Sequence, residues 1–203
     1  GELGFLIDAI GPGTRALCAL RPGDTLSVLG PLGNGFDLDV EKPLLVGGGI
    51  GVAPLAILRR RFAERAVPLR VLLGFRDRAH AGGLELFCGS GDDLCPEVRL
   101  ASEDGHAGHR GYVTDLLTTM LAGDDAGSAV VYSCGPPAML EVVRLLCAEH
   151  AVPCELALES PMACGFGACF GCAVPKLGGG YLRLCVDGPV LAGAAVAEVP
   201  AHA

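Results

Sequence analysis

The chain has 203 residues, of which 51% are hydrophobic and 19% charged, so it is neither disordered nor a polyelectrolyte. The formal net charge is −8, and the sequence has no basic run of the kind that a surface for nucleic acids or anionic lipids requires, which argues against both partners. The 31 glycines are about twice the usual share of roughly 7% and follow no G-x-y period, which indicates close turns and excludes collagen. The ten cysteines fall below the roughly 8–10% of a disulfide scaffold.

The sequence contains no segment suited to crossing a membrane. It starts at Gly1 without a charged n-region or an apolar h-region. One of its longest uncharged runs, residues 43–58, is shorter than the about 20 residues that span a bilayer, and it contains four glycines and two prolines. We therefore expect a cytoplasmic protein without a membrane span.

Residues 1–40 predict short β elements separated by turns. Strands are expected at residues 3–10 and 25–29, with a helical turn at 14–20 between them and further turns within 30–35. Two or three strands cannot bury a core by themselves. We therefore interpret this zone as part of an antiparallel β-barrel.

Residues 41–159 alternate between strand-like and helical segments. The strand-like runs cover residues 43–46, 69–75, 97–100, 129–133 and 154–158. The helical patterns cover residues 52–65, 111–121 and 137–150, with a short helix at 82–87. Such alternation predicts an α/β nucleotide-binding domain, a parallel sheet with helices on both faces.

Residues 160–203 lose this alternation and predict a small cysteine-rich lobe. A loop rich in glycine and cysteine at 164–172 leads to a short hairpin around residues 178–180. A strand near residues 182–186 and an Ala-rich tail complete the expected lobe.

The most specific pattern is a set of four cysteines with the spacing C-x4-C-x2-C-x12-C: Cys164, Cys169, Cys172 and Cys185. This spacing is that of plant-type [2Fe–2S] clusters, which take four thiolates. Zinc is the alternative, although zinc ribbons carry two C-x2-C knuckles and this loop has one. Disulfides are disfavoured because no secretory signal is present. The other six cysteines are Cys18, Cys88, Cys95, Cys134, Cys147 and Cys154. We expect most of them to be small core residues, with Cys134, which stands in one of the turns described below, as the exception.

Three turns have the composition of nucleotide-binding sites. The first turn lies between an apolar strand and a helix, and its glycines are Gly47, Gly48, Gly49 and Gly51. At such a place the oriented N–H groups of the helix N-terminus can bind a pyrophosphate. The turn departs from the G-x-G-x-x-G pattern because Pro54 replaces the third glycine. Tight packing alone remains an alternative explanation of these glycines.

The second turn, residues 11–14, precedes a short helix and can seat another pyrophosphate through Gly11, Gly13 and Thr14, or else serve only as a helix cap. The third turn, Cys134, Gly135 and Pro136, stands at the end of a strand, where a flat nicotinamide needs small residues. Its alternative is an ordinary junction with proline in the first helical turn.

Together these motifs resemble the ferredoxin-reductase-like flavoproteins, and among them most closely the electron-transfer subunits of class B dihydroorotate dehydrogenases. The resemblance rests on residues 11–14, 30–36, 47–54, 134–139 and 159–189. It implies that the first and third turns bind NAD and that the second binds FAD, with Leu6, Ile7 and Asp8 running beside the FAD. It also implies that the four spaced cysteines ligate the [2Fe–2S] cluster.

The same resemblance implies the function. Dihydroorotate would be oxidised at FMN on a partner subunit, in a heterotetramer of two subunits of each kind, and the electrons would pass through [2Fe–2S] and FAD to NAD⁺ in pyrimidine biosynthesis. A flavin is needed because nicotinamide moves a hydride whereas the cluster moves single electrons. No side chain of this chain need act as an acid, base or nucleophile. The choice of NAD over NADP rests on the resemblance alone.

Two departures from the family pattern are visible. Members begin with further barrel strands that carry an Arg-Pro-x-Ser-like segment for the flavin ring, and this sequence has none, so we expect an incomplete barrel that holds FAD weakly. Pro161 also stands where arginine is expected.

Two other functions are open. One is a related NAD(P)H-linked or electron-bifurcating reductase subunit, and the bifurcating relatives would place Asp where Cys164 stands. A zinc-stabilised interaction module without redox activity would be colourless.

Overall fold

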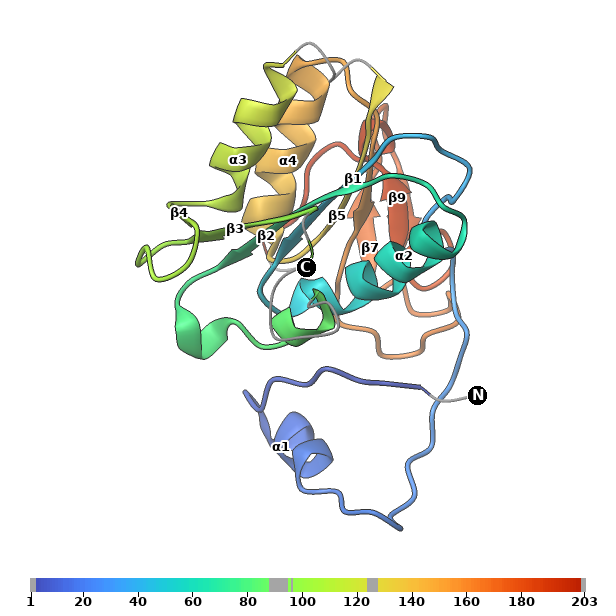
Figure 1. Cartoon of the computed structure of the whole chain (residues 1–203). Coiled ribbons are helices and arrows are strands. Elements are labelled where there is room, and N and C mark those ends of the chain that lie inside the picture. Colours follow the sequence, from blue (N-terminus) through green and yellow to red (C-terminus); the bar gives the residue numbers. More distant parts are fainter. Residues whose placement is uncertain (1–2, 88–94, 96, 124–127, 202–203) are drawn as a thin grey trace.

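A seven-stranded sheet forms the centre of the molecule (Figure 1). The computed structural model describes residues 3–87, 95, 97–123 and 128–201. The sheet order is β4-β3-β2-β1-β5-β6-β9, and every neighbouring pair is parallel except β6 and β9. The strands are β1 (Pro43–Gly48), β2 (Arg70–Phe75), β3 (Val98–Ser102), β4 (His109–Arg110), β5 (Val130–Cys134), β6 (Cys154–Ala157) and β9 (Val190–Ala192).

Helices cover both faces of this sheet, as the alternation predicted. Figure 1 shows α2 (Val52–Glu64) on one face, and α3 (Val113–Leu121) and α4 (Pro137–Glu149) side by side on the other. Short 3-10 helices occur at η1 (Gly49–Gly51), η2 (Arg78–His80), η3 (Leu84–Phe87) and η5 (Gly193–Ala195). The predicted α/β fold class is confirmed.

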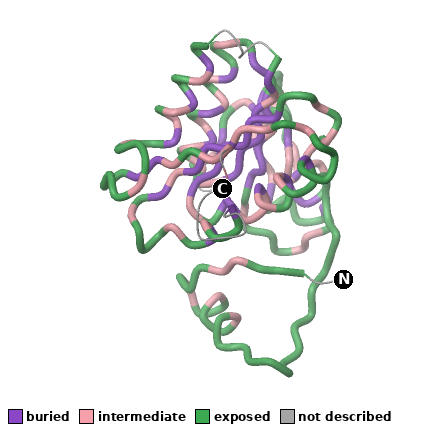
Figure 2. The backbone as a smooth tube through the Cα atoms, in the orientation of Figure 1, coloured by how far each residue is buried: buried purple, intermediate pink, exposed green. Residues whose placement is uncertain are grey.

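The core lies in two layers, one on each side of the sheet. Figure 2 shows buried residues concentrated along the central strands. Along β1, Leu44 and Val46 pack toward α3 and α4, whereas Leu45 packs toward Leu55 and Phe62 of α2. Because successive strand residues point to opposite faces and both faces are covered, β1 is buried at every position. This explains why the strand is a continuous apolar run.

The N-terminal segment differs from the expectation. Between residues 3 and 42 the structure contains one helix, α1 (Pro12–Cys18), and an isolated bridge from Asn34 to Pro189. The strands expected at 3–10 and 25–29 are therefore wrong, because a strand requires a hydrogen-bonded neighbour and none of the described residues supplies one. Figure 2 shows this segment as largely exposed.

The C-terminal hairpin is confirmed, but the expected Ala-rich tail is part of the folded molecule. Strands β7 (Ala173–Pro175) and β8 (Tyr181–Arg183) pair antiparallel. Beyond them, β9 joins the main sheet beside β6, and Val196 and Val199 are buried. The alanine content of residues 190–199 concealed these apolar positions, whose burial depends on β6 and α4.

Replacing a buried leucine of α3 tests the layer between α3 and the sheet. Leu117 is 0% exposed, so Leu117→Ala leaves a cavity and should lower the free energy of unfolding by about 2–5 kcal/mol. The matched control is Leu145→Ala on α4, where the side chain is 52% exposed and the expected cost is about 0.5 kcal/mol. Urea unfolding followed by circular dichroism measures both, and equal losses would contradict this packing.

Candidate functional site

Two glycine-rich turns meet at the carboxyl ends of β1 and β5. From β1 the sheet runs to β2 and β3 on one side and to β5 and β6 on the other, so the connections change direction between β1 and β5. Open α/β sheets bind ligands outside the strand ends at such a switch point. Gly47 and Cys134 stand opposite each other in register at this place.

The two turns approach so closely that side chains would not fit between them. A Cβ on Gly51 would lie 2.5 Å from the Cys134 carbonyl, and a Cβ on Gly48 would lie 2.5 Å from the sulfur of Met139. Gly135 has φ +155°, a conformation that favours glycine. Tight packing therefore accounts for these glycines, and the same packing brings the N-terminal end of α2 to the cleft.

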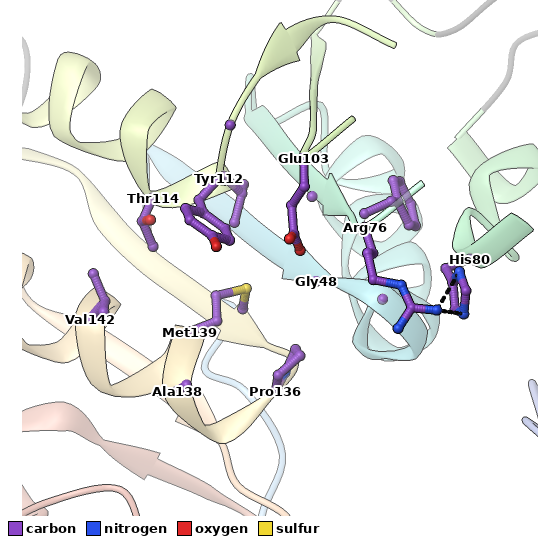
Figure 3. Close-up of a pocket in the computed structure, with 15 residues that line it drawn as sticks. Gly48, Arg76, His80, Glu103, Tyr112, Thr114, Pro136, Ala138, Met139 and Val142 are labelled. Carbon is purple, nitrogen blue, oxygen red and sulfur yellow. Dashed lines mark hydrogen bonds between the residues drawn. The ribbon is translucent and has the colours of Figure 1, made fainter. Parts of the chain in front are cut away.

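A cavity of about 560 Å³ opens beside these turns (Figure 3). Of the residues predicted to bind the nicotinamide nucleotide, Gly48, Gly49 and Pro136 line it, whereas Gly47, Gly51, Cys134 and Gly135 do not. The remaining lining residues are Gly74, Phe75, Arg76, His80, Glu103, Gly111, Tyr112, Val113, Thr114, Ala138, Met139 and Val142.

Two polar side chains of this cavity, Glu103 and Tyr112, were missed by the sequence patterns. Figure 3 shows Arg76, Glu103 and Tyr112 along its wall, and each follows the carboxyl end of a strand. The charge of Arg76 is countered by Asp77, whose carboxylate lies 3.3 Å from its Nε. A hydrogen bond with His80 is the main cause that lowers the pKa of Asp77 to about 2. The position of Glu103 and Tyr112 after parallel strands was the one signal in the sequence that could have identified them.

Cys134 has no nucleophilic role in this geometry. Its thiol is buried, and burial raises its pKa to about 12, with a smaller contribution from the charge of Glu159. The thiol is therefore protonated at neutral pH and serves as a small apolar group behind the cleft.

The turn at residues 11–14 is a helix cap. The N–H of Gly11 donates to the Thr14 hydroxyl at 3.0 Å, and that hydroxyl donates to the Gly11 carbonyl at 3.2 Å. Gly13 is exposed on α1, as is Asp8 upstream of it. Leu6 and Ile7 are half-buried, and Leu6 packs against the core layer that contains α2.

The chain brings the four spaced cysteines together as two pairs. The sulfurs of Cys172 and Cys185 lie 3.3 Å apart, and the Cys164 thiol is hydrogen-bonded to that of Cys169. Two pairs of thiols suit two irons, each taking two thiolates. Within the part of the chain that the structure describes, no three His, Cys, Asp or Glu side chains are placed around a single ion site.

Backbone N–H groups point at these sulfurs. The N–H groups of Cys169, Phe166 and Ala168 lower the pKa of Cys164 to about 6, with that of Cys169 contributing most. The hydrogen bond between the sulfurs of Cys172 and Cys185 is the main cause that raises the pKa of Cys185. Gly165 and Gly167 have φ +74° and +86°, which lets the loop turn its N–H groups inward. The donor set therefore fits an iron-sulfur cluster.

The other six cysteines divide between core and surface. Cys147 and Cys154 are buried, as expected, and Cys134 is buried as well, whereas Cys18 is exposed and Cys95 is partly exposed. Cys88 lies outside the described residues.

Comparisons with known proteins agree with this division of the chain. Residues 159–197 match the iron-sulfur cluster binding domain of dihydroorotate dehydrogenase B, and residues 45–145 match the oxidoreductase NAD-binding domain. The chain thus contains an iron-sulfur cluster-binding domain and an NAD-binding domain. Among the described residues, no helix combines the length and the apolar composition needed to span a bilayer.

Relatives with the name dihydroorotate dehydrogenase B (NAD(+)), electron transfer subunit, cover nearly the whole chain. The one from Caldanaerobacter subterraneus subsp. tengcongensis is 38% identical over 93% of this chain and 73% of its own length. The one from Bacillus caldolyticus is 40% identical over 94% of this chain and 72% of its own length. The chain belongs to the family of dihydroorotate dehydrogenase B electron-transfer subunits.

Solved structures show the same architecture. The NADH-dependent reduced ferredoxin-NADP oxidoreductase, studied for flavin-based electron bifurcation, superimposes with a TM-score of 0.78 at 30% identity, covering 94% of this chain and 67% of that one. The cytochrome b5 reductase domain of Ulva prolifera nitrate reductase superimposes with a TM-score of 0.54 at 19% identity, covering 70% of this chain and 60% of that one. This second similarity shows a shared fold alone.

The low pKa of Cys164 predicts its reactivity in the metal-free chain. Iodoacetamide should label Cys164 at a rate that rises through about pH 6 and levels off above it, because the thiolate is the reactive form. Cys185, which is buried and has a raised pKa, should stay unlabelled over the same range. Peptide mass spectrometry gives both rates, and a Cys164 midpoint near the ordinary value of about 8.5 would contradict the loop geometry.

Proposed function

We propose that this chain is the electron-transfer subunit of an NAD-dependent dihydroorotate dehydrogenase B. It would carry electrons from dihydroorotate, oxidised on an FMN-containing catalytic partner subunit, to NAD⁺ in pyrimidine biosynthesis, as part of a heterotetramer. The observation that carries the proposal is the gathering of four thiols on a lobe attached to a sheet with a nucleotide cleft. The relatives' names and the similarity over nearly the full chain support it.

The proposed roles follow the geometry. Cys164, Cys169, Cys172 and Cys185 hold a [2Fe–2S] cluster, which supplies one-electron transfer when bound. The turns at 47–51 and 134–136 bind NAD, directly through Gly48, Gly49 and Pro136 and indirectly by keeping the cleft open and rigid.

FAD is the third proposed cofactor, since a carrier of both single electrons and hydride is required. Residues 6–8 and 11–14 are its proposed contacts. The N-terminal position of Gly13 on α1 suits a phosphate, but Thr14 would have to give up its cap bond to donate to one. The proposed domains are residues 1–40 for FAD, 41–159 for NAD and 160–203 for the cluster.

A second function, as subunit of an electron-bifurcating reductase, is supported by the 30% identity to the NADH-dependent reduced ferredoxin-NADP oxidoreductase. The higher identity of 38–40% to the dihydroorotate dehydrogenase subunits favours the first function, as does Cys164 at the position where that alternative expects Asp.

Iron, sulfide and flavin per purified chain test the cofactors, and reconstitution tests the function. With a catalytic subunit from a family member added, dihydroorotate should reduce NAD⁺ only when this chain is present. A colourless protein with one zinc per chain would overturn the redox function. A chain with iron and flavin that accepts electrons from reduced ferredoxin but not from that partner would favour the second function.

Replacing one buried thiol should remove the cluster. Cys172→Ser weakens a ligand at a 2% exposed position, so the visible absorption of the cluster should be lost and dihydroorotate-dependent NAD⁺ reduction should fall at least about 100-fold. Cys18→Ser, on the exposed surface of α1, should keep both. Full iron content in Cys172→Ser would contradict the proposed ligand set.

Glu103 predicts the coenzyme preference. Figure 3 shows its carboxylate in the cavity between Arg76 and Tyr112. A carboxylate there can accept hydrogen bonds from the ribose hydroxyls of NAD⁺ and repels the 2′-phosphate of NADP⁺. Glu103→Gln should lower the ratio of the Kd for NADP⁺ to the Kd for NAD⁺ about tenfold, equivalent to about 1.4 kcal/mol. Calorimetric titration measures both constants, with Glu149→Gln at the exposed end of α4 as the control. An unchanged ratio would exclude Glu103 from the ribose site.

A further inference from the structure

One charged side chain holds the loop that carries three of the thiols, and neither proposed function uses it. Arg183 is the last residue of β8, two residues before Cys185. Its Nη1 donates to the carbonyl of Gly167 at 3.0 Å, and its guanidinium lies over the ring of Phe170, 5.2 Å from the centroid. Gly167 and Phe170 flank Cys169 in the loop. Arg183 therefore ties this loop to the segment of Cys185.

Gly167 transmits this contact to a thiol. Its N–H donates to the sulfur of Cys185, while its carbonyl accepts from Arg183. A Cβ on Gly167 would lie 2.7 Å from Cγ2 of Val186 and 3.2 Å from Nη1 of Arg183, so the residue is closely enclosed. The position of the N–H that faces Cys185 thus depends on Arg183.

A carboxylate accompanies the guanidinium. Oδ2 of Asp187 accepts the backbone N–H of Arg183 at 2.7 Å and lies 3.7 Å from its Nε. Both side chains are about one third exposed, 32% and 36%, so solvent screens their charges only in part. A cation and an anion therefore stand two residues before and two residues after Cys185.

A fixed charge close to a cluster acts on the redox equilibrium of that cluster. Reduction adds an electron to a group that four thiolates already make anionic, so a nearby cation favours the reduced form and a nearby anion favours the oxidised form. The side chain that holds the loop carries one of these charges, and the carboxylate opposes it.

We propose that Arg183 and Asp187 form a charge pair that sets the reduction potential of the cluster, with Arg183 also positioning the loop that surrounds it. The inference rests on the proposed cluster and is independent of the catalytic partner. Arg183 is a positioning residue: it touches the loop and neither substrate nor iron.

Redox titration of the purified chain, followed by electron paramagnetic resonance of the reduced cluster, tests the pair. In Arg183→Gln the ratio of reduced to oxidised cluster at a fixed ambient potential should fall about tenfold, a downward shift of about 59 mV for a one-electron couple. Asp187→Asn, which keeps an oxygen for the N–H of Arg183, should shift the potential upward. The double variant should lie between the two, near the unaltered chain.

Two further variants separate charge from structure. Arg183→Lys keeps the charge but loses the guanidinium that lies over Phe170 and donates to Gly167, so its potential should stay closer to that of the unaltered chain than that of Arg183→Gln. Arg60→Gln, at an exposed position on α2, should leave the potential unchanged.

The outcomes are distinguishable. Shifts of Arg183→Gln and Asp187→Asn in the same direction, or no shift beyond that of Arg60→Gln, would overturn the inference while leaving the proposed function intact. If Arg183→Gln assembles no cluster, the positioning role is supported and the direction of the Asp187→Asn shift decides the electrostatic one. An unaltered chain without iron and sulfide would overturn the proposed function, and this inference with it.

Discussion

The contact on which the site depends is the approach of two backbone turns after β1 and β5. Gly51 faces the Cys134 carbonyl with no space for a Cβ, and Gly48 faces Met139 in the same way. Any larger residue would separate these turns or force a side chain out of its rotamer. Because β1 and β5 flank the switch point of the sheet, this contact fixes the cavity beside it.

A second junction joins the cysteine-rich lobe to the rest of the molecule. Asn34 donates through Nδ2 to the carbonyls of Val186 and Asp187, and through its backbone N–H to that of Gly188. The chain then enters β9, which pairs with β6. The N-terminal segment, the lobe and the sheet therefore meet in the residues that follow Cys185. A change at this junction would move the thiols relative to both other parts.

The regular part of the fold was predictable because local patterns and tertiary packing agree there. The helices α2, α3 and α4 were predicted to within two residues at each end, since each has an apolar stripe at helical spacing, as Val113, Leu117 and Leu121 show for α3. The N-terminal strands and the Ala-rich tail failed for opposite reasons. The first had strand patterns without a pairing neighbour, and the second gained a neighbour, β6, that lies far away in sequence.

By itself, the sequence determined the parallel α/β architecture, the glycine turns and the four cysteines, because each is encoded by spacing along the chain. Only the tertiary structure decided which residues face one another. It paired Cys172 with Cys185, placed Arg76, Glu103 and Tyr112 around one cavity, and set Arg183 against the loop at Gly167. These residues come from different strands and loops, and nothing local to any of them specifies the partner. The order of the main sheet brings the cavity residues together, and the pairing of β7 with β8 brings the lobe residues together.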